Sequence, residues 1–396
     1  MSKEALFQSI EEQTDGLFQM ACDIFDHPEI GCQEFFASKL LADALEAEGF
    51  QVERGVADLE TAFRATWSHG EGGPNIGILG EYDALAERGH GCGHHLQTPA
   101  AIGAAVSLKR LYEALDLSGA DGANTPFTIT IYGTPAEETI GGKILMAKKG
   151  CFEELDIALG THACTKTAFI GDKSFAIRSF QVTFRGKNAH ACAAWGGRSA
   201  ADAMILSFNG IEFLREHVKE DTRMHYAISE TYGPTNVVPA TAKAKYTLRS
   251  KDNKYLAELE ERFRKLIQGA CLMTETEAEI VRNENMYAAR KSNLVLAETV
   301  GETFEMMDMP VKRALLSDSG GSTDFGNVST IVPSALIYIP YFDAPSHSEE
   351  WVQAGKTDAA RACLTNSAKA LAGTMYDLIL RPELVKKARE EFELNE

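Results

Sequence analysis

The stretch Asn75-Ile-Gly-Ile-Leu-Gly80 is followed at once by Glu81-Tyr-Asp83 and then by Gly89-His-Gly-Cys-Gly-His94. A short apolar run of this kind is typical of a strand that is buried on both faces. Three further apolar runs share this character, and helix-like segments lie beside the four runs. The further runs are Thr128-Ile-Thr-Ile-Tyr132, Ile157-Ala-Leu159 and Ala335-Leu-Ile-Tyr-Ile339, and the helix-like segments are 97–115, 143–149 and 358–380. The alternation predicts an α/β layer with a mostly parallel sheet.

The middle of the chain follows a different pattern. Apolar and polar residues alternate over 180–185 and again over 242–249. A period of two is typical of an antiparallel sheet with one face in water. Apolar stripes at helical spacing over 204–214 and 256–266 predict two amphipathic helices beside these strands.

These two patterns predict two domains, as does the length of 396 residues. We expect a compact α+β domain at residues 175–286. It is inserted into a larger α/β domain formed by residues 1–174 and 287–396.

The composition excludes several classes of function. The net charge of −18, from 39 basic and 57 acidic residues, repels phosphate backbones and anionic membranes. We therefore expect no nucleic-acid partner and no membrane partner. Acidic residues near the N-terminus argue against a secretory signal, and the longest apolar stretch is too short to span a bilayer. Eight scattered cysteines favour reduced thiols and a cytoplasmic location.

Candidate metal ligands follow all four apolar runs. In open α/β sheets, ligands bind beyond the carboxyl ends of the strands, and these side chains should therefore meet there. Cysteine, histidine and glutamate together form a ligand set that suits zinc or manganese. The candidate metal ligands are Cys92, His94, Glu138, His162 and His347.

The adjacent residues Glu137 and Glu138 suit a division of labour. Because neighbouring side chains diverge, Glu138 can hold a metal while Glu137 accepts a proton from water as general base. Asp83 either orients a metal ligand or begins a turn, and the sequence leaves both open.

Other interpretations of these residues exist. Cys92 alone is compatible with a small buried hydrophobic residue or with a nucleophile paired with histidine. The Gly89-His-Gly-Cys-Gly93 spacing hints at dinucleotide binding, although its third glycine comes one position early. Glu137 and Glu138 alone fit a solvated helix start.

Three motifs together resemble the M20 family of metallopeptidases and amidohydrolases, and its M20D branch in particular. They are Gly89-His-Gly-Cys-Gly-His94, Gly133-Thr-Pro-Ala-Glu-Glu138 with the following Gly141-Gly-Lys143, and Ser346-His347-Ser348. The form of the second motif is similar to that of the aminobenzoyl-glutamate hydrolases and β-alanyl-lysine dipeptidases of this branch. The likeness extends over nearly the whole chain.

The resemblance implies a mostly parallel-sheet catalytic domain with an inserted ferredoxin-like lid domain that forms a homodimer. It implies two divalent ions, Zn²⁺ or Mn²⁺, held by the five candidate ligands, with Glu137 as the base. It further implies that His190 stabilises an oxyanion in the partner subunit's site, and that Asn236 and Arg249 bind polar groups of the substrate. Considered alone, these three residues would be a loop histidine, a turn residue and a solvent-facing charge.

The chain departs from the family pattern at His95, where relatives commonly carry Asn or Asp. It also lacks the prolines that are usual after His162 and before Trp195. None of these departures removes a candidate ligand or the base. They leave the identity of the substrate open.

The sequence therefore predicts a dinuclear metal-dependent hydrolase. It would cleave an amide bond in a small molecule: a dipeptide, an N-acyl amino acid or an aminobenzoyl-glutamate-like substrate. The alternatives are a hydrolytic deaminase of an aromatic amino acid-like substrate that uses the same site, and an inactive metal-binding scaffold.

Overall fold

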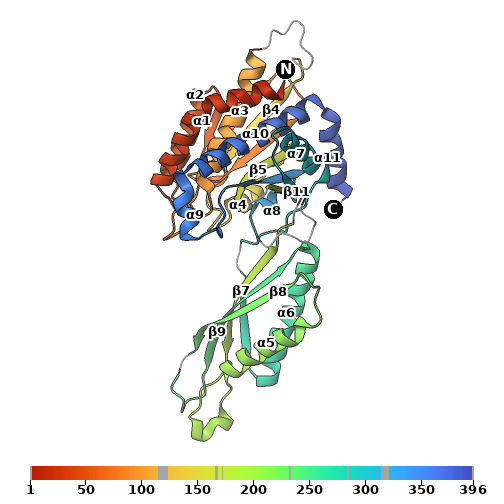
Figure 1. Ribbon diagram of the computed structural model, residues 1–396. Coiled ribbons are helices and arrows are strands. Elements are labelled where there is room, and N and C mark those ends of the chain that lie inside the picture. Colours follow the sequence, from red (N-terminus) through yellow and green to blue (C-terminus); the bar gives the residue numbers. More distant parts are fainter. Residues whose placement is uncertain are drawn as a thin grey trace. The chain divides into compact units, whose positions relative to one another are not determined.

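The computed structural model describes residues 2–114, 124–165, 168–171, 173–231, 233–282, 285–313 and 321–394. The chain divides into two compact units, which are coloured along the sequence in Figure 1. Unit 1 comprises Met1–Lys173, Lys291–Ser319 and Asn327–Glu396, and unit 2 comprises Ser174–Arg290 and Gly320–Gly326. The short segment Gly320–Gly326 differs from the predicted division, which assigned it to the larger domain.

Unit 1 is built on an eight-stranded sheet with the order β1-β2-β4-β3-β5-β12-β6-β11. The four predicted apolar runs are β4, β3, β5 and β12, which are neighbours at the centre of the sheet and run parallel. The more polar β1 and β2 continue the sheet in antiparallel pairing. The strands are β1 (Gln51–Arg54), β2 (Phe63–His69), β3 (Asn75–Gly80), β4 (Phe127–Gly133), β5 (Ile157–Cys164), β6 (Ala168–Ile170), β11 (Val311–Arg313) and β12 (Ser334–Pro340).

Helices cover this sheet. Among them, α1, α3 and α10 pack on one another. The helices of unit 1 are α1 (Lys3–Asp26), α2 (Phe35–Ala47), α3 (Gln97–Glu113), α4 (Gly142–Lys148), α7 (Leu294–Met306), α9 (Glu349–Gln353), α10 (Asp358–Leu380) and α11 (Pro382–Leu394). The short helix α8 (Phe325–Val328) begins in unit 2 and ends in unit 1.

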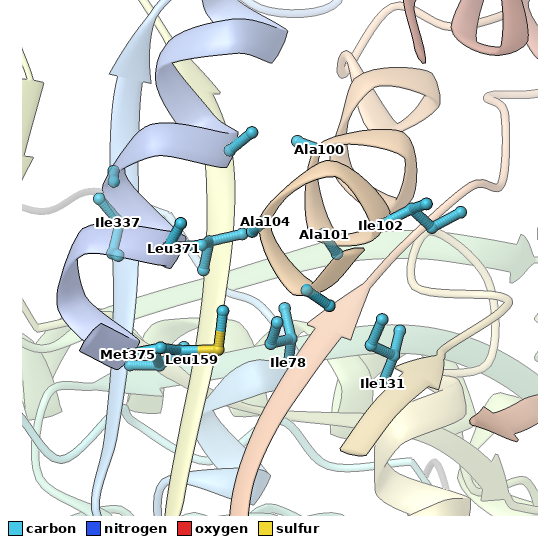
Figure 2. Packing of buried hydrophobic residues seen from close by; sticks show 14 of the residues in the cluster. Ile78, Ala100, Ala101, Ile102, Ala104, Ile131, Leu159, Ile337, Leu371 and Met375 are labelled. Atoms are coloured by element: carbon cyan, nitrogen blue, oxygen red, sulfur yellow. The ribbon is translucent and has the colours of Figure 1, made fainter. Parts of the chain in front are cut away.

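Small and large side chains interlock between helix and sheet at the centre of unit 1. Figure 2 shows Ala101 and Ala104 of α3 and Leu371 of α10 facing Ile78 and Leu159 of the parallel strands. All five side chains are at most 1% exposed. Burying each large aliphatic side chain contributes about 1.5–3 kcal/mol. This core fixes the strands, and with them the positions of the loops at their carboxyl ends.

Unit 2 is a four-stranded antiparallel sheet, in the order β10-β7-β9-β8, with two helices. The β-α-β-β-α-β succession is that of a ferredoxin-like fold. Val182, Phe184, Tyr246 and Leu248 point to the helices, as the alternating pattern predicted. The elements are β7 (Ala176–Arg185), α5 (Ala200–Arg215), β8 (Arg223–Thr231), β9 (Thr241–Ser250), α6 (Asn253–Thr274) and β10 (Glu277–Arg282). The predicted fold class, a mostly parallel α/β domain with an inserted α+β domain, is confirmed.

Within the described part of the chain, no helix combines the length and the apolar character needed to cross a bilayer.

Candidate metal centre

The Cys92–His94 segment is placed by the end of β3 and the start of α3. Gly93 adopts φ +84°, a left-handed conformation that glycine reaches without strain. A side chain on Gly93 would also crowd Ala163 of β5, since an added Cβ would lie 3.1 Å from the Ala163 Cβ. The chain then enters a single 3₁₀ turn, His94–Leu96, directly before α3. This tight turn holds Cys92 and His94 at the edge of the sheet.

His162 and His347 reach the same place by different routes. His162 lies within β5 rather than after it, because β5 pairs with β12 as far as Cys164. The loop bearing His347 is attached to the cysteine loop, since the His347 N–H donates to the Gly91 carbonyl at 2.9 Å. Arg88 also donates to the His347 carbonyl, at 3.0 Å.

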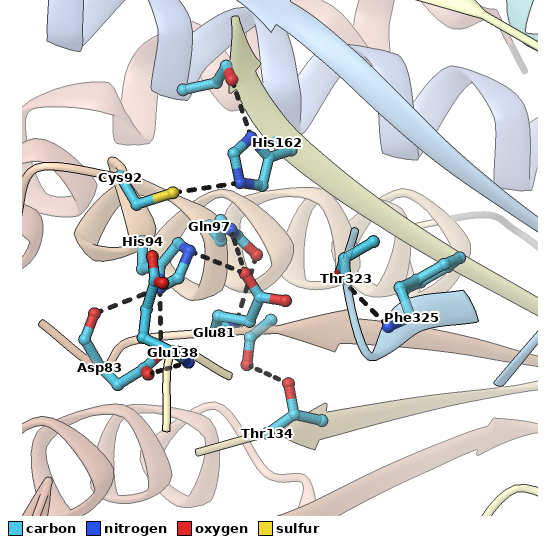
Figure 3. Close-up of polar contacts among 12 residues, drawn as sticks. Glu81, Asp83, Cys92, His94, Gln97, Thr134, Glu138, His162, Thr323 and Phe325 are labelled. Carbon is cyan, nitrogen blue, oxygen red and sulfur yellow. Dashed lines mark hydrogen bonds and ion pairs between the residues drawn. The ribbon is translucent and has the colours of Figure 1, made fainter. Parts of the chain in front are cut away.

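Asp83 forms hydrogen bonds with two of the candidate ligands at once. Its Oδ1 accepts from His94 Nδ1 at 2.9 Å, and its Oδ2 accepts from the Glu138 backbone N–H at 2.9 Å (Figure 3). Because a carboxylate only accepts, His94 carries its proton on Nδ1 and presents Nε2 to the site. Asp83 therefore contacts two of the candidate ligands, and its role in orienting them stays a prediction.

The structure brings the five candidate ligands and Glu137 together in overlapping groups. Within each group, the ligand atoms all lie within 4.8 Å of one another. Cys92 Sγ lies 3.5 Å from His162 Nε2, and His347 Nε2 lies 3.6 Å from Glu138 Oε1. The groups are Cys92 with His94 and His162, Cys92 with Glu138 and His347, and His94 with Glu137 and Glu138.

The electrostatics of these groups fit a divalent cation. Burial raises the pKa of Cys92 to about 12, and the thiol therefore keeps its proton until a cation displaces it. His94 Nε2 is buried and has no hydrogen-bond partner among the described residues. A buried nitrogen left open beside a thiol and carboxylates is a metal-ligand arrangement.

The turn before Glu137 is strained. Ala136 has φ +61°, and its N–H donates to Glu34 Oε1 at 2.7 Å. The other oxygen of Glu34 accepts from Thr61 Oγ1 at 2.9 Å. Glu34 is fully buried and holds the turn from which Glu137 and Glu138 diverge. Glu34 was not among the predicted site residues, because it precedes its partner Ala136 by 102 residues.

Glu81 is a second residue that is absent from the predicted site. Glu81 directly follows the last residue of β3, and Asp83 comes two residues later. The Glu81 Oε2 atom lies 3.1 Å from His94 Nε2. Glu81 stands at a strand end as Asp83 does, and this position is the signal that would have identified it.

His95, whose role the sequence left open, is not part of the groups of ligand atoms. Its ring is buried against Phe25 and His90, with centroid distances of 5.0 and 5.1 Å. Its Nε2 is 3.0 Å from the Gly355 carbonyl. Burial lowers the pKa of His95 well below its ordinary value and keeps the ring neutral. His95 therefore packs among buried neighbours directly after the Cys92–His94 segment.

The remaining candidate residues lie in unit 2. The segments that bear His190 and Asn236 run side by side, because the Ala191 N–H donates to the Asn236 carbonyl at 2.8 Å and His190 forms a β-bridge with Val237. Both side chains are exposed. Arg249 lies on β9, half-buried, and its Nε has no hydrogen-bond partner among the described residues.

Fold and site together define a metallohydrolase with an inserted α+β domain. The chain belongs to peptidase family M20/M25/M40, whose family model matches residues 77–372.

Two relatives match nearly the full length of this chain. One of the subunits of the p-aminobenzoyl-glutamate hydrolase of Escherichia coli (strain K12) is 31% identical, and the match covers 97% of this chain and 93% of the relative. The Xaa-Arg dipeptidase of Mus musculus is 32% identical, with 98% and 92% covered.

Solved structures share the fold. The Bacillus subtilis YXEP protein, described as a dinuclear metal-binding peptidase of the M20 family, has a TM-score of 0.70 at 17% identity, covering 92% of this chain and 99% of that chain. The aminobenzoyl-glutamate utilization protein from Klebsiella pneumoniae has a TM-score of 0.68 at 21% identity, covering 91% and 98%. The protein is therefore a metal-dependent hydrolase of amide bonds that acts on small molecules.

Proposed function

We propose that this protein is a dinuclear hydrolase that cleaves a dipeptide, an N-acyl amino acid or an aminobenzoyl-glutamate-like amide. The names of the two relatives at about one-third identity, a p-aminobenzoyl-glutamate hydrolase and an Xaa-Arg dipeptidase, support this range of substrates. The observation that carries the proposal is that Cys92 Sγ belongs to two separate groups of ligand atoms. One thiolate shared by two groups supports a pair of cations.

In this proposal, Cys92, His94 and His162 hold one ion, and Cys92, Glu138 and His347 hold the other. The mixed sulfur, nitrogen and oxygen donors suit Zn²⁺ or Mn²⁺. Divalent ions supply Lewis acidity there, which acidifies water and polarises an amide carbonyl.

Glu137 is the general base of the proposed reaction. Its side chain is 8% exposed, and its carboxylate shares a group with His94 and Glu138. From there it takes the proton of the attacking water and returns it to the leaving amine. The diverging neighbour Glu138 remains free to act as a ligand.

Exchanging Glu137 for Gln tests this role. The variant keeps the size of the side chain but cannot accept the proton, and we expect turnover to fall by at least about 10³ while both ions stay bound. Metal content by elemental analysis and release of the amino acid from a panel of dipeptides, N-acyl amino acids and aminobenzoyl-glutamate are the measurements. Retained turnover would overturn the role of Glu137, and release of ammonia in place of an amino acid would favour a deaminase.

Unit 2 supplies the second part of the proposed machinery, as a homodimerisation domain. Phe208 of α5 stacks on Tyr226 of the edge strand β8, and other large apolar side chains are exposed beside this pair. Ile205 and Phe213 on α5 and Ile228 on β8 are 52%, 76% and 59% exposed. An edge strand beside exposed apolar side chains supports pairing with a second copy of the chain.

In the dimer, His190 stabilises the oxyanion in the partner's site, while Asn236 and Arg249 bind the substrate. The unpartnered Nε and planar fork of Arg249 suit a substrate carboxylate. Removing His190 should lower kcat by about 10²–10³. A mixture of His190→Ala and Glu137→Gln chains should regain activity through heterodimers, and a mixture that stays inactive would overturn action across subunits.

We also propose a cytoplasmic location, which the scattered cysteine spacing supports.

A further inference from the structure

A second buried carboxylate, Glu81, is fixed with both oxygens oriented. Lys143 Nζ contacts Oε1 at 2.5 Å, and Gln97 Nε2 donates to Oε2 at 2.7 Å (Figure 3). Gln97 Oε1 in turn accepts from the Glu81 backbone N–H at 3.2 Å. The three side chains are 4%, 1% and 5% exposed for Glu81, Lys143 and Gln97. Three segments of unit 1, the end of β3 and the starts of α3 and α4, thus hold this carboxylate in one orientation.

Glu81 forms a buried ion pair with Lys143. Because Lys143 balances its charge, the pair presents an oxygen donor to the site without adding net charge.

The presented oxygen faces His94. Oε2 lies 3.1 Å from His94 Nε2, yet the contact lacks the direction of a hydrogen bond. The in-plane lone pair of Nε2 therefore points beside Oε2 rather than at it. Two atoms that each bind one ion at about 2.1 Å are about 3.0–3.4 Å apart. The separation between Oε2 and Nε2 fits two ligands of the same cation.

We propose that Glu81 is a further metal ligand, which binds through Oε2 the same ion as His94, with Lys143 and Gln97 as its positioning residues. The inference rests on the proposed dinuclear site and extends it by one oxygen donor. An ion pair serving stability alone would need only the contact with Lys143, whereas here Gln97 directs the second oxygen to the open nitrogen of His94.

Metal binding to the full-length, metal-free protein tests the proposal. For Glu81→Gln, we expect Mn²⁺ and Zn²⁺ affinity at one of the two sites to fall at least about 10-fold in competition with a chelator, as for other residues around metal sites. With Co²⁺, the thiolate charge-transfer band of Cys92 should persist while the visible bands change with the coordination. Unchanged affinity together with an unchanged Co²⁺ spectrum would overturn the proposal.

The double variant Glu81→Gln with Lys143→Met is the matched control. It removes both charges of the ion pair, and no buried charge is left without its partner. If Glu81 is a ligand, the double variant folds and still binds one ion weakly. Wild-type affinity in the double variant would reduce Glu81 to a structural role and overturn the inference. The wild-type protein is measured in parallel to distinguish the Glu81 inference from the proposed dinuclear function. A wild type that takes up no ions would overturn the proposed function.

Discussion

At the scale of single residues, Asp83 has the most consequential pair of contacts. Its two oxygens bind the His94 ring and the Glu138 backbone. In Asp83→Asn, one oxygen becomes an NH₂ group, which faces an N–H donor and cannot accept. We expect metal affinity or kcat to fall about 10–100-fold. Chelator competition and steady-state kinetics measure the two quantities.

Asp156→Asn provides the control for that variant. Asp156 also accepts a backbone N–H, from Asn75 at 2.9 Å, but it is not in the groups of ligand atoms. We expect its metal affinity to equal that of the wild type. Equal losses in both variants would mean that Asp83 acts through general stability rather than through the ligands.

The sequence was sufficient to select the residues whose side chains gather at the strand ends. Cys92, His94, Glu137, Glu138, His162 and His347 all come together. Their roles as ligands and base stay predictions. Glu34 was missed because it is defined by a distant partner, Ala136, 102 residues further along the chain. Local patterns carry no information about such a pair. Glu81 had a usable signal, its place directly after β3.

At the scale of elements, Glu260 of α6 forms a cluster of ion pairs in unit 2. The carboxylate is 4% exposed and contacts Arg178 of β7, Arg264 of α6 and Arg282 of β10. Burial would raise the pKa of Glu260, but these arginines outweigh burial and lower it. One side chain thus joins the helix to two strands.

The lowered pKa of Glu260 makes stability depend on pH. The contribution of this carboxylate is fully present above its ordinary pKa near 4.5 and is lost as the pH falls through the lowered value. Glu260→Gln should cost about 1–3 kcal/mol at pH 7 and weaken the loss of stability below about pH 5. Thermal unfolding between pH 3 and pH 7 measures both effects.

Glu279→Gln is the comparison for Glu260. Glu279 pairs with Arg185 at 3.1 Å, but both side chains are largely exposed. Exposed pairs contribute about 0–1 kcal/mol, and this variant should follow the wild-type curve. A Glu260 variant that also followed the wild-type curve would contradict the structural role of the arginine cluster.

Helices and strands were predictable from the sequence where the burial of apolar side chains alone determines them. The central strands β3, β4, β5 and β12 are apolar on both faces, and their existence was predicted. The short strands β1 and β6, of four and three residues, were not predicted, because their place depends on the neighbouring strands with which they pair. The end of β5 was also missed, since the pairing with β12 prolongs it through His162.

At the scale of the whole molecule, the apolar side of unit 2 predicts the oligomeric state. Ile228→Glu places a charge among the exposed side chains of β8 and α5, and we expect the dimer to dissociate into monomers. If His190 acts in the partner's site, kcat should fall as the dimer dissociates. Light scattering after gel filtration gives the mass, and kinetics on the same samples give kcat.

Leu272→Glu is the matched control for the dimer. Leu272 is 73% exposed on α6, which packs on the β10 side of the sheet. This variant should remain dimeric and active. An Ile228→Glu protein that stays a dimer would exclude the β8 side as the interface.

The two ends of the long segment of unit 2, Ser174–Arg290, have a consequence for how such proteins diversify. The strands that enter and leave unit 2 are neighbours: β7 pairs with β10, and the Arg290 N–H donates to Ser174 Oγ at 3.0 Å. The inserted segment 174–290 thus begins and ends at neighbouring positions. Recombination can exchange such a segment without reordering a strand of the host sheet. The proposed substrate and dimer contacts of unit 2 can then change while the framework of the candidate metal site stays intact.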